Sequence, residues 1–119
     1  MNSTIFELLE RIKEKPGLYL GYPSVQRLFM FLNGYDLARE ELGIELPPEE
    51  ENFYAKFQPW MQKKLGVRTV TSWAKLIMLS CHDEKTGFER FFELLSEFRQ
   101  KKDLSTSVDE HCLPVVVMQ

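Results

Sequence analysis

The sequence predicts a single all-α domain of five or six helices over residues 1–102, followed by an irregular C-terminal tail over residues 103–119. Three observations lead to this prediction. The length of 119 residues suits one domain. Five separate segments place apolar side chains three or four residues apart, which is the spacing of one helix face. Only Leu113–Met118 is strongly β-prone, and a lone strand has no ladder partner in a helical domain.

The first helix is expected over Thr4–Glu14, where a capping box (Thr4 with Glu7) precedes an apolar stripe formed by Ile5, Leu8, Leu9 and Ile12. Pro16 followed by Gly17 should end it, because proline disfavours helical dihedral angles in the residue before it. If the connector that follows is extended, Leu18 and Leu20 point inward and Tyr19 points the other way. Gly17 would permit a positive φ.

A long second helix is expected over Val25–Leu42, with Ser24 as its N-cap and Gly43 just past its C-terminus. A third helix should begin at the acidic run of Glu49, Glu50 and Glu51, since the helix dipole favours acidic side chains in the first turn. Gly66 closes this segment. Pro59 lies inside it and is predicted to kink the helix or split it in two.

Two more helices are expected after Val67–Val70, a segment that suits either a strand or a connector. Ser72 should cap the first, which carries Trp73, Leu76 and Ile77. Asp83 should cap the second, whose apolar stripe consists of Phe88, Phe91, Phe92, Leu95 and Phe98. Gly87 costs that helix about 1 kcal/mol relative to Ala, so its first turn is expected to fray. The tail is expected to pack in extended form, to pair with another chain or to be disordered.

Composition excludes several classes of function. The net charge of −3 disfavours a generic nucleic-acid binder, which needs a basic footprint. No apolar run approaches the roughly 18 residues of a membrane span, and the first residues do not look like a signal peptide. Two cysteines in such a chain indicate reduced thiols and a cytoplasmic protein.

Charge is segregated along the chain. Residues 36–51, here called the acidic segment, hold seven acids against one base, whereas residues 52–82 hold five bases and no acid. One interpretation is that these are solvated helix faces that pair with each other. The other is that the acidic segment steers a basic partner toward the protein. Its acids are Asp36, Glu40, Glu41, Glu45, Glu49, Glu50 and Glu51.

Few residues suggest catalysis or metal binding. Cys81-His82 and His111-Cys112 supply zinc-type ligands, but adjacent residues on a helix point about 100° apart and do not converge on one metal. The chain contains no Gly-x-Gly and no familiar hydrolase or metalloprotease motif. We therefore expect no catalytic residue, no metal and no cofactor. An aromatic pocket around Tyr35, Trp73 and His82 is the alternative that would allow ligand binding or enzymatic activity.

The most distinctive stretch is Lys15–Gly21, with the sequence Lys-Pro-Gly-Leu-Tyr-Leu-Gly. It is similar to a run near the start of the ATPase domain of type II topoisomerase B subunits, but the glycine motifs of that nucleotide pocket are missing. Together with Leu32–Tyr35, Trp73 and Phe91–Phe98, it resembles a family of small all-helical bacterial proteins. Some members of that family resemble immunity proteins encoded beside polymorphic, Rhs-type toxins. This chain has Lys-Pro-Gly-Leu where the family more often has Arg-Pro-Gly-Met or Lys-Pro-Gly-Met.

We therefore expect a non-enzymatic protein-binding module, a toxin-neutralising immunity protein according to the resemblance. Its partner would be a basic toxin domain, contacted by the acidic segment and by Tyr19 and Tyr22. A homo-oligomeric structural protein, such as a homodimer joined through the tail, is a further alternative. Neither nucleic acid nor a membrane is expected as a partner.

Overall fold

The computed structural model describes residues 4–68 and 71–104, with side chains described as far as Gln100. This part of the chain is all-α, as predicted, and contains six helices and no strand. The β-prone run Leu113–Met118 lies outside the described residues. The helices are α1 (Ile5–Glu14), α2 (Pro16–Leu20), α3 (Val25–Glu41), α4 (Pro48–Leu65), α5 (Trp73–Met78) and α6 (Glu84–Leu104).

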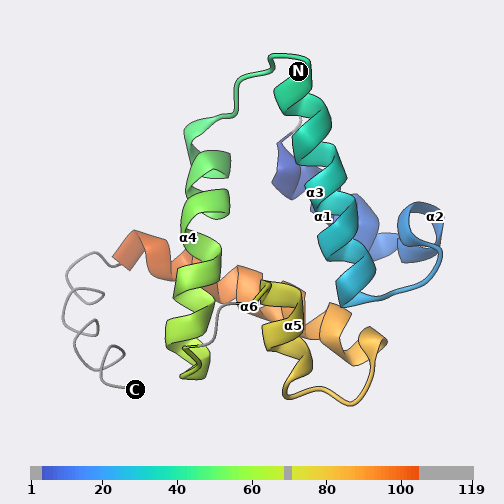
Figure 1. The fold of residues 1–119 in the computed structure, drawn as a ribbon, viewed down its shortest axis with the longest axis vertical. Coiled ribbons are helices and arrows are strands. Elements are labelled where there is room, and N and C mark those ends of the chain that lie inside the picture. Colours follow the sequence, from blue (N-terminus) through green and yellow to red (C-terminus); the bar gives the residue numbers. More distant parts are fainter. Residues whose placement is uncertain (1–3, 69–70, 105–119) are drawn as a thin grey trace.

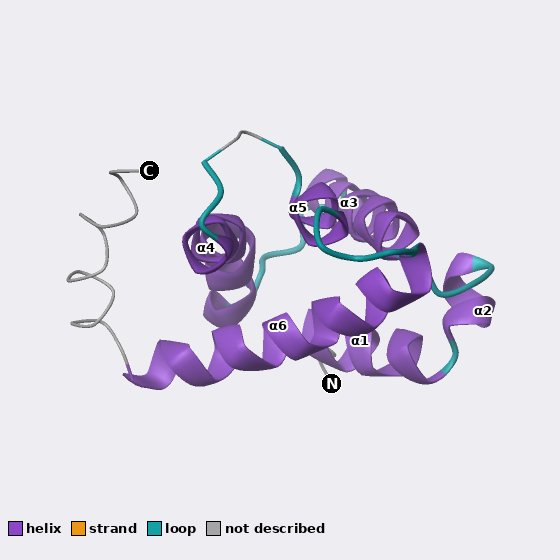
Figure 2. Cartoon of the chain, turned by 90° about the horizontal axis from the view of Figure 1, so that it is seen from below, coloured by secondary structure: helices purple, strands orange, loops and turns teal. Residues whose placement is uncertain are grey.

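Helix α6 is the element on which the others converge. Figure 1 shows α3 and α4 running lengthwise on two sides of the molecule, with α6 crossing behind the middle of α4 and passing near the lower end of α3. Helix α5 packs against α3, α4 and α6, and so fills the space between the two long helices. Figure 2 shows the same crossing from below, with α1 and α2 beside the N-terminal half of α6.

The predicted helix boundaries are largely confirmed at their caps. Gly43 and Gly66 adopt positive φ angles of 72° and 71° just after α3 and α4. Four side chains accept a hydrogen bond from the backbone N–H three residues later, and these are Thr4, Ser24, Ser72 and Asp83. The hydrogen bond from the Thr86 N–H also lowers the pKa of the Asp83 carboxyl.

Two boundaries differ from those expected from the sequence. Of the two outcomes expected at Pro59, a kink or a split, the split does not occur, because helix α4 continues from Pro48 to Leu65. Proline removes a backbone donor from the ladder, but Phe57 and Met61 on either side are fully buried, and their packing holds the helix together. Helix α6 runs to Leu104, two residues beyond the expected end of the helical domain.

The core is a cluster of aromatic rings where α4, α5 and α6 meet. Phe57 is 1% exposed, and its ring centroid lies 5.8 Å from that of Trp73, 5.7 Å from Phe91 and 5.3 Å from Phe98. Such edge-to-face contacts add about 0.5–1.5 kcal/mol per pair to the burial of the rings. Within residues 4–68 and 71–104, the helices are too short or too polar to cross a membrane.

Gly87 lies in this packed region rather than in a frayed turn. It is buried in α6, and a Cβ atom there would stand 2.8 Å from Val25 Cγ1 and 2.9 Å from Met78 Sδ. The missing side chain therefore lets α6 approach α3 and α5 closely.

One carboxylate links the start of α6 to the start of α3. Glu84 Oε1 accepts hydrogen bonds from the Ser24 hydroxyl at 2.8 Å and from the Gln26 backbone N–H at 3.0 Å. Burial by itself raises the pKa of Glu84, but these hydrogen bonds to the ionised form outweigh it and lower the pKa overall.

Candidate functional site

The Lys15–Gly21 stretch folds into α2 and the turn that follows it. Pro16 occupies the first helical position, where its missing N–H costs nothing. The segment is therefore helical rather than extended, and the two leucines do not both point inward, since Leu20 is buried but Leu18 is 73% exposed. The positive φ, 89°, falls at Gly21 rather than at Gly17.

Arg27 fixes α2 to α3. Its Nη1 donates a 2.8 Å hydrogen bond to the Leu20 carbonyl, which is one of the acceptors left open at the end of α2. Its guanidinium carbon also lies 4.3 Å from the centroid of the Tyr22 ring. A Cβ at Gly21 would stand 2.6 Å from Arg27 Nη1, so the glycine makes room for this contact. The exposed side chains of α2 are thereby held in place relative to α3.

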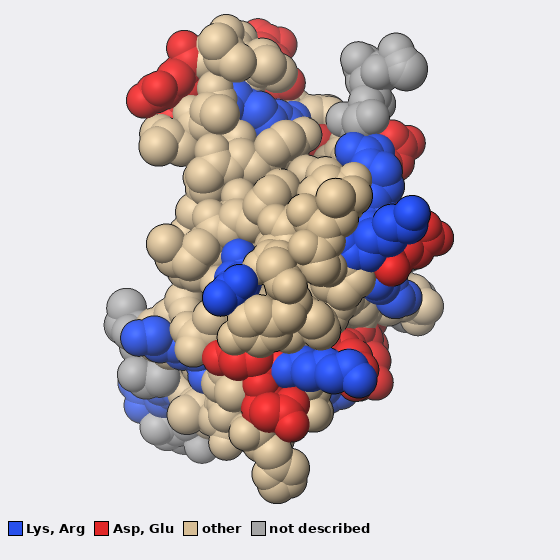
Figure 3. Space-filling model, turned by 90° about the vertical axis from the view of Figure 1, so that its right-hand side faces the viewer, with Lys and Arg blue, Asp and Glu red and all other residues tan. Residues whose placement is uncertain are grey.

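These two helices present an apolar surface, here called the α2–α3 face, whose exposed members are Leu18, Tyr22, Met30 and Leu37. Met30 and Leu37 are 66% and 54% exposed and lie two turns apart on one stripe of α3. Tyr19 packs edge-to-face on Phe31 beside a hollow of about 470 Å³ that reaches Met30. Figure 3 looks at the side of the molecule that carries α2 and α3, and it shows a broad uncharged area with most charged groups at its margins.

The acidic segment does not form one exposed surface. Glu40, Glu41 and Glu45 are exposed at and beyond the end of α3, as are Glu49 and Glu51 in the first turn of α4, while Asp36 is half-buried. Glu50, in contrast, is 0% exposed. Its prediction as a partner-binding residue is wrong.

Glu50 is a structural residue in a buried ion pair. One carboxylate oxygen accepts the Ile5 backbone N–H at 2.9 Å, and the other lies 2.8 Å from Arg39 Nη1. Burial by itself lowers the pKa of Arg39, but the hydrogen bond and charge of Glu50 outweigh it, so the pKa is raised. The signal was present in the sequence, because Glu50 falls on the same helical stripe as Phe53 and Phe57.

The Tyr35, Trp73 and His82 pocket is not formed as predicted. Trp73 is only 9% exposed and packs among the core rings. Tyr35 lies under the Arg39 guanidinium, whose carbon is 4.9 Å from the centroid of the Tyr35 ring, and His82 is exposed in the turn before α6.

The Tyr54 hydroxyl, near Tyr35 and Arg39, is buried without a hydrogen-bond partner among the described residues. Burial is the main cause of the raised pKa of Tyr54.

The structure describes only one of the two cysteines and one of the two histidines. Cys81 carries a free, half-buried thiol after α5, whereas His111 and Cys112 lie outside the described residues. Within the part of the chain that the structure describes, no group of three or more His, Cys, Asp or Glu side chains could hold a metal ion.

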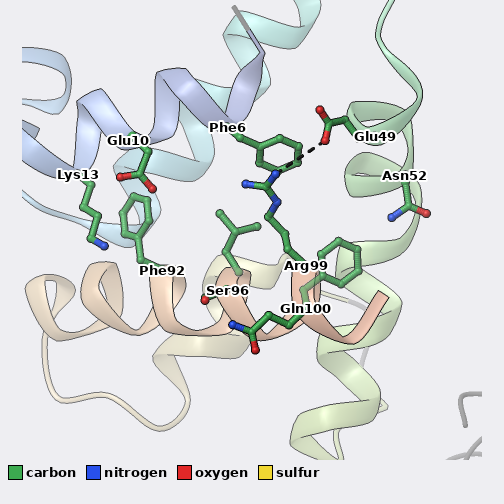
Figure 4. Close-up of a pocket in the computed structure, with 11 residues that line it drawn as sticks. Phe6, Glu10, Lys13, Glu49, Asn52, Phe92, Ser96, Arg99 and Gln100 are labelled. Carbon is green, nitrogen blue, oxygen red and sulfur yellow. Dashed lines mark ion pairs between the residues drawn. The ribbon is translucent and has the colours of Figure 1, made fainter. Parts of the chain in front are cut away.

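Sequence reasoning missed a second hollow, here called the α1–α6 cavity, which has a volume of about 490 Å³. Figure 4 shows the Arg99 side chain extending from α6 toward Glu49 of α4, with its guanidinium against the Phe6 ring of α1. Lys13 and Glu10 of α1 lie at the other end, beside Phe92. Because three helices distant in sequence line this cavity, no local motif could have revealed it.

No protein-family model, no curated protein and no solved structure matches the chain.

Proposed function

We propose that the chain is a non-enzymatic protein-binding module, a bacterial immunity protein that neutralises a toxin in the cytoplasm, and that the α2–α3 face is its binding surface. The observation that carries the proposal is the group of large apolar side chains exposed on this face. Large exposed apolar side chains on one side of a protein favour a protein–protein contact there. The immunity role is added by the family resemblance of the Lys15–Gly21 stretch, which builds part of the face.

The shape of the face suits a protein partner better than a small molecule. Leu18 and Met30 project into solvent, and the hollow beside Tyr19 and Phe31 offers a place for one side chain of a partner. Burying a side chain of the size of Leu or Met contributes about 1.5–3 kcal/mol, so a few such contacts can supply most of the binding energy.

The charge near the face favours a basic partner. Figure 3 shows acidic groups at the upper end of this surface and again at its lower end, and Glu40, Glu41 and Glu45 are exposed where α3 ends. Exposed acids of this kind raise the association rate with a basic protein more than they raise the affinity. A basic toxin domain, such as a nuclease, has the complementary charge.

The proposal predicts that a neighbouring gene encodes a toxin domain, and that domain is the probe for the test. We expect the two purified proteins to form a complex, and Met30→Asp to weaken it by about 100-fold, because the change puts a charge into an apolar contact. The matched control is Leu79→Asp, since Leu79 is equally exposed, at 68%, but lies at the end of α5. Calorimetry gives the affinities, and survival of cells that express the toxin gives the biological readout. Equal affinity of the Met30→Asp variant and the wild type would refute the assignment of the face.

Two alternatives to the immunity role make different predictions. A ligand-binding role is favoured by the α1–α6 cavity, and it predicts that the protein binds a small molecule there. The other alternative is a homo-oligomer joined through the tail, which lies mostly outside the described residues. It predicts that light scattering detects an oligomer for the full chain and not for a chain truncated after Leu104.

A further inference from the structure

We infer that the α1–α6 cavity binds a carboxylate attached to an apolar group of about the size of an aromatic ring, with Arg99 as the residue that binds the carboxylate. The inference is independent of the proposed function, because the lining of this cavity shares no residue with the α2–α3 face. It rests on the position of Arg99, on the apolar floor of the cavity and on the placement of its acids.

Arg99 is held by an aromatic ring and not by a close ion pair. Its guanidinium carbon lies 3.8 Å from the centroid of the Phe6 ring, an arrangement in which the ring supports the cation through its face. Its Nη2 lies 3.8 Å from Glu49 Oε1, which is longer than a hydrogen bond. The side chain is about half exposed, so its N–H groups remain available to an incoming acceptor. A planar guanidinium matches a carboxylate in two parallel hydrogen bonds.

The floor of the cavity is apolar. Phe92, Leu95 and Phe98 line it from α6, and each is less than 10% exposed. Asn52, Ser96 and Gln100 add uncharged polar groups to the lining. The volume of about 490 Å³ lies within the range of small-molecule sites, and the exposed part of the lining is more polar than apolar.

The acids of the cavity restrict the charge of the ligand. Glu49 lies beside Arg99, and Glu10 lies at the other end near Lys13, whose Nζ is 5.4 Å from the centroid of the Phe92 ring. A second carboxylate at the far end would meet Glu10 as well as Lys13, whose charges offset each other, so it would gain less than the first carboxylate gains at Arg99. The expected ligand therefore carries a single carboxylate.

Such a carboxylate has two sources, a free organic acid or the C-terminal residue of a peptide. An adjoining hollow of about 720 Å³ shares Lys13, Phe92 and Ser96 with the cavity and extends to Pro16 and Phe88. The residues that precede a peptide's C-terminus could occupy this extension. A longer peptide should then bind more tightly than its terminal residue alone.

The test is a titration followed by nuclear magnetic resonance of the backbone amides, with N-acetyl-phenylalanine as the probe. We expect shifts of the α1 and α6 amides around Phe6 and Arg99. N-acetyl-phenylalaninamide, which has the same body without the charge, should bind at least about tenfold more weakly. Equal binding of acid and amide would overturn the inference without any variant, as would the absence of shifts at millimolar concentrations of the acid.

Two variants should change the affinity for the acid in opposite directions, and a third serves as their control. Arg99→Gln should weaken binding of the acid by about tenfold or more, whereas Glu49→Gln should strengthen it, because it removes the charge that competes for Arg99. Arg90→Gln is the matched control, since Arg90 lies on the same helix, pairs with Glu93 at 3.0 Å and lines neither hollow. Weakening by Glu49→Gln, or equal affinities of the Arg99→Gln and Arg90→Gln variants, would contradict the assignment.

A tetrapeptide with a C-terminal Phe separates the two sources. Tighter binding than N-acetyl-phenylalanine, with new shifts around Pro16 and Phe88, supports a peptide terminus. Equal affinity without those shifts supports a free acid. Both results retain the carboxylate site, whereas loss of toxin binding in the Met30→Asp variant concerns the other face and leaves this inference unaffected.

Discussion

Neutralising Glu50 should destabilise the protein far more than neutralising the acid on either side of it. The Glu50→Gln change leaves the Arg39 guanidinium, 9% exposed, without its counter-charge. Removal of one partner of a buried ion pair costs about 3–5 kcal/mol. The Gln carbonyl can still accept one of the two hydrogen bonds that Glu50 accepts, so we expect the lower end, about 3 kcal/mol. Glu49→Gln and Glu51→Gln, both at exposed positions, should cost about 0–1 kcal/mol each.

The assay is urea unfolding followed by circular dichroism for each of the three single variants. A loss of about 3 kcal/mol corresponds to a fall in Tm of about 10 °C or more for a domain of this size. Adding Arg39→Met to Glu50→Gln should recover part of the loss, because the uncompensated buried charge is then gone. If Glu50→Gln lies within about 1 kcal/mol of Glu51→Gln, the reasoning about the buried pair is wrong.

Two further predictions concern the start of α6. Gly87→Ala removes about 1 kcal/mol of helix-propensity cost, but the new Cβ would crowd Val25 and Met78, and such overpacking costs about 1–3 kcal/mol. The variant should therefore be less stable than the wild type by up to about 2 kcal/mol. A higher urea midpoint for the variant would contradict this. Because the pKa of Glu84 is lowered in the folded state, its contribution to stability is fully present above the usual pKa of 4.5 and is lost as the pH falls through the lower pKa of the folded state. The free energy of unfolding should therefore fall less steeply with decreasing pH for Glu84→Gln than for the wild type. Parallel curves for the two proteins would exclude this linkage.

Local signals were sufficient to predict most of the fold. A side chain such as Ser24 or Asp83 caps a helix through the N–H three residues later, so the interaction is contained in the sequence that forms it. Gly43 and Gly66 end helices for a similar reason, since the conformation required there is one that glycine adopts at little cost. Apolar stripes then identified the face of each helix that is buried.

Contacts between distant segments were not predictable in this way. Glu50 was grouped with its acidic neighbours because net charge along a segment ignores the direction in which each side chain points. The exposure of Leu18 depends on α2 being a helix, and the buried position of Gly87 depends on where α6 crosses α3. Arg99 became a candidate site residue only when α1 and α4 were placed beside it.

The carboxylate of Glu84 makes the first turn of α3 dependent on a residue 58 positions away from Gln26, whose N–H it accepts. An isolated peptide that contains α3 alone lacks this acceptor, so its first turn should be only partly ordered. In native-state hydrogen exchange, the amide of Gln26 should open together with the first turn of α6 and not with the rest of α3. The two helix starts would then behave as one cooperative unit, although the chain between them includes all of α4 and α5.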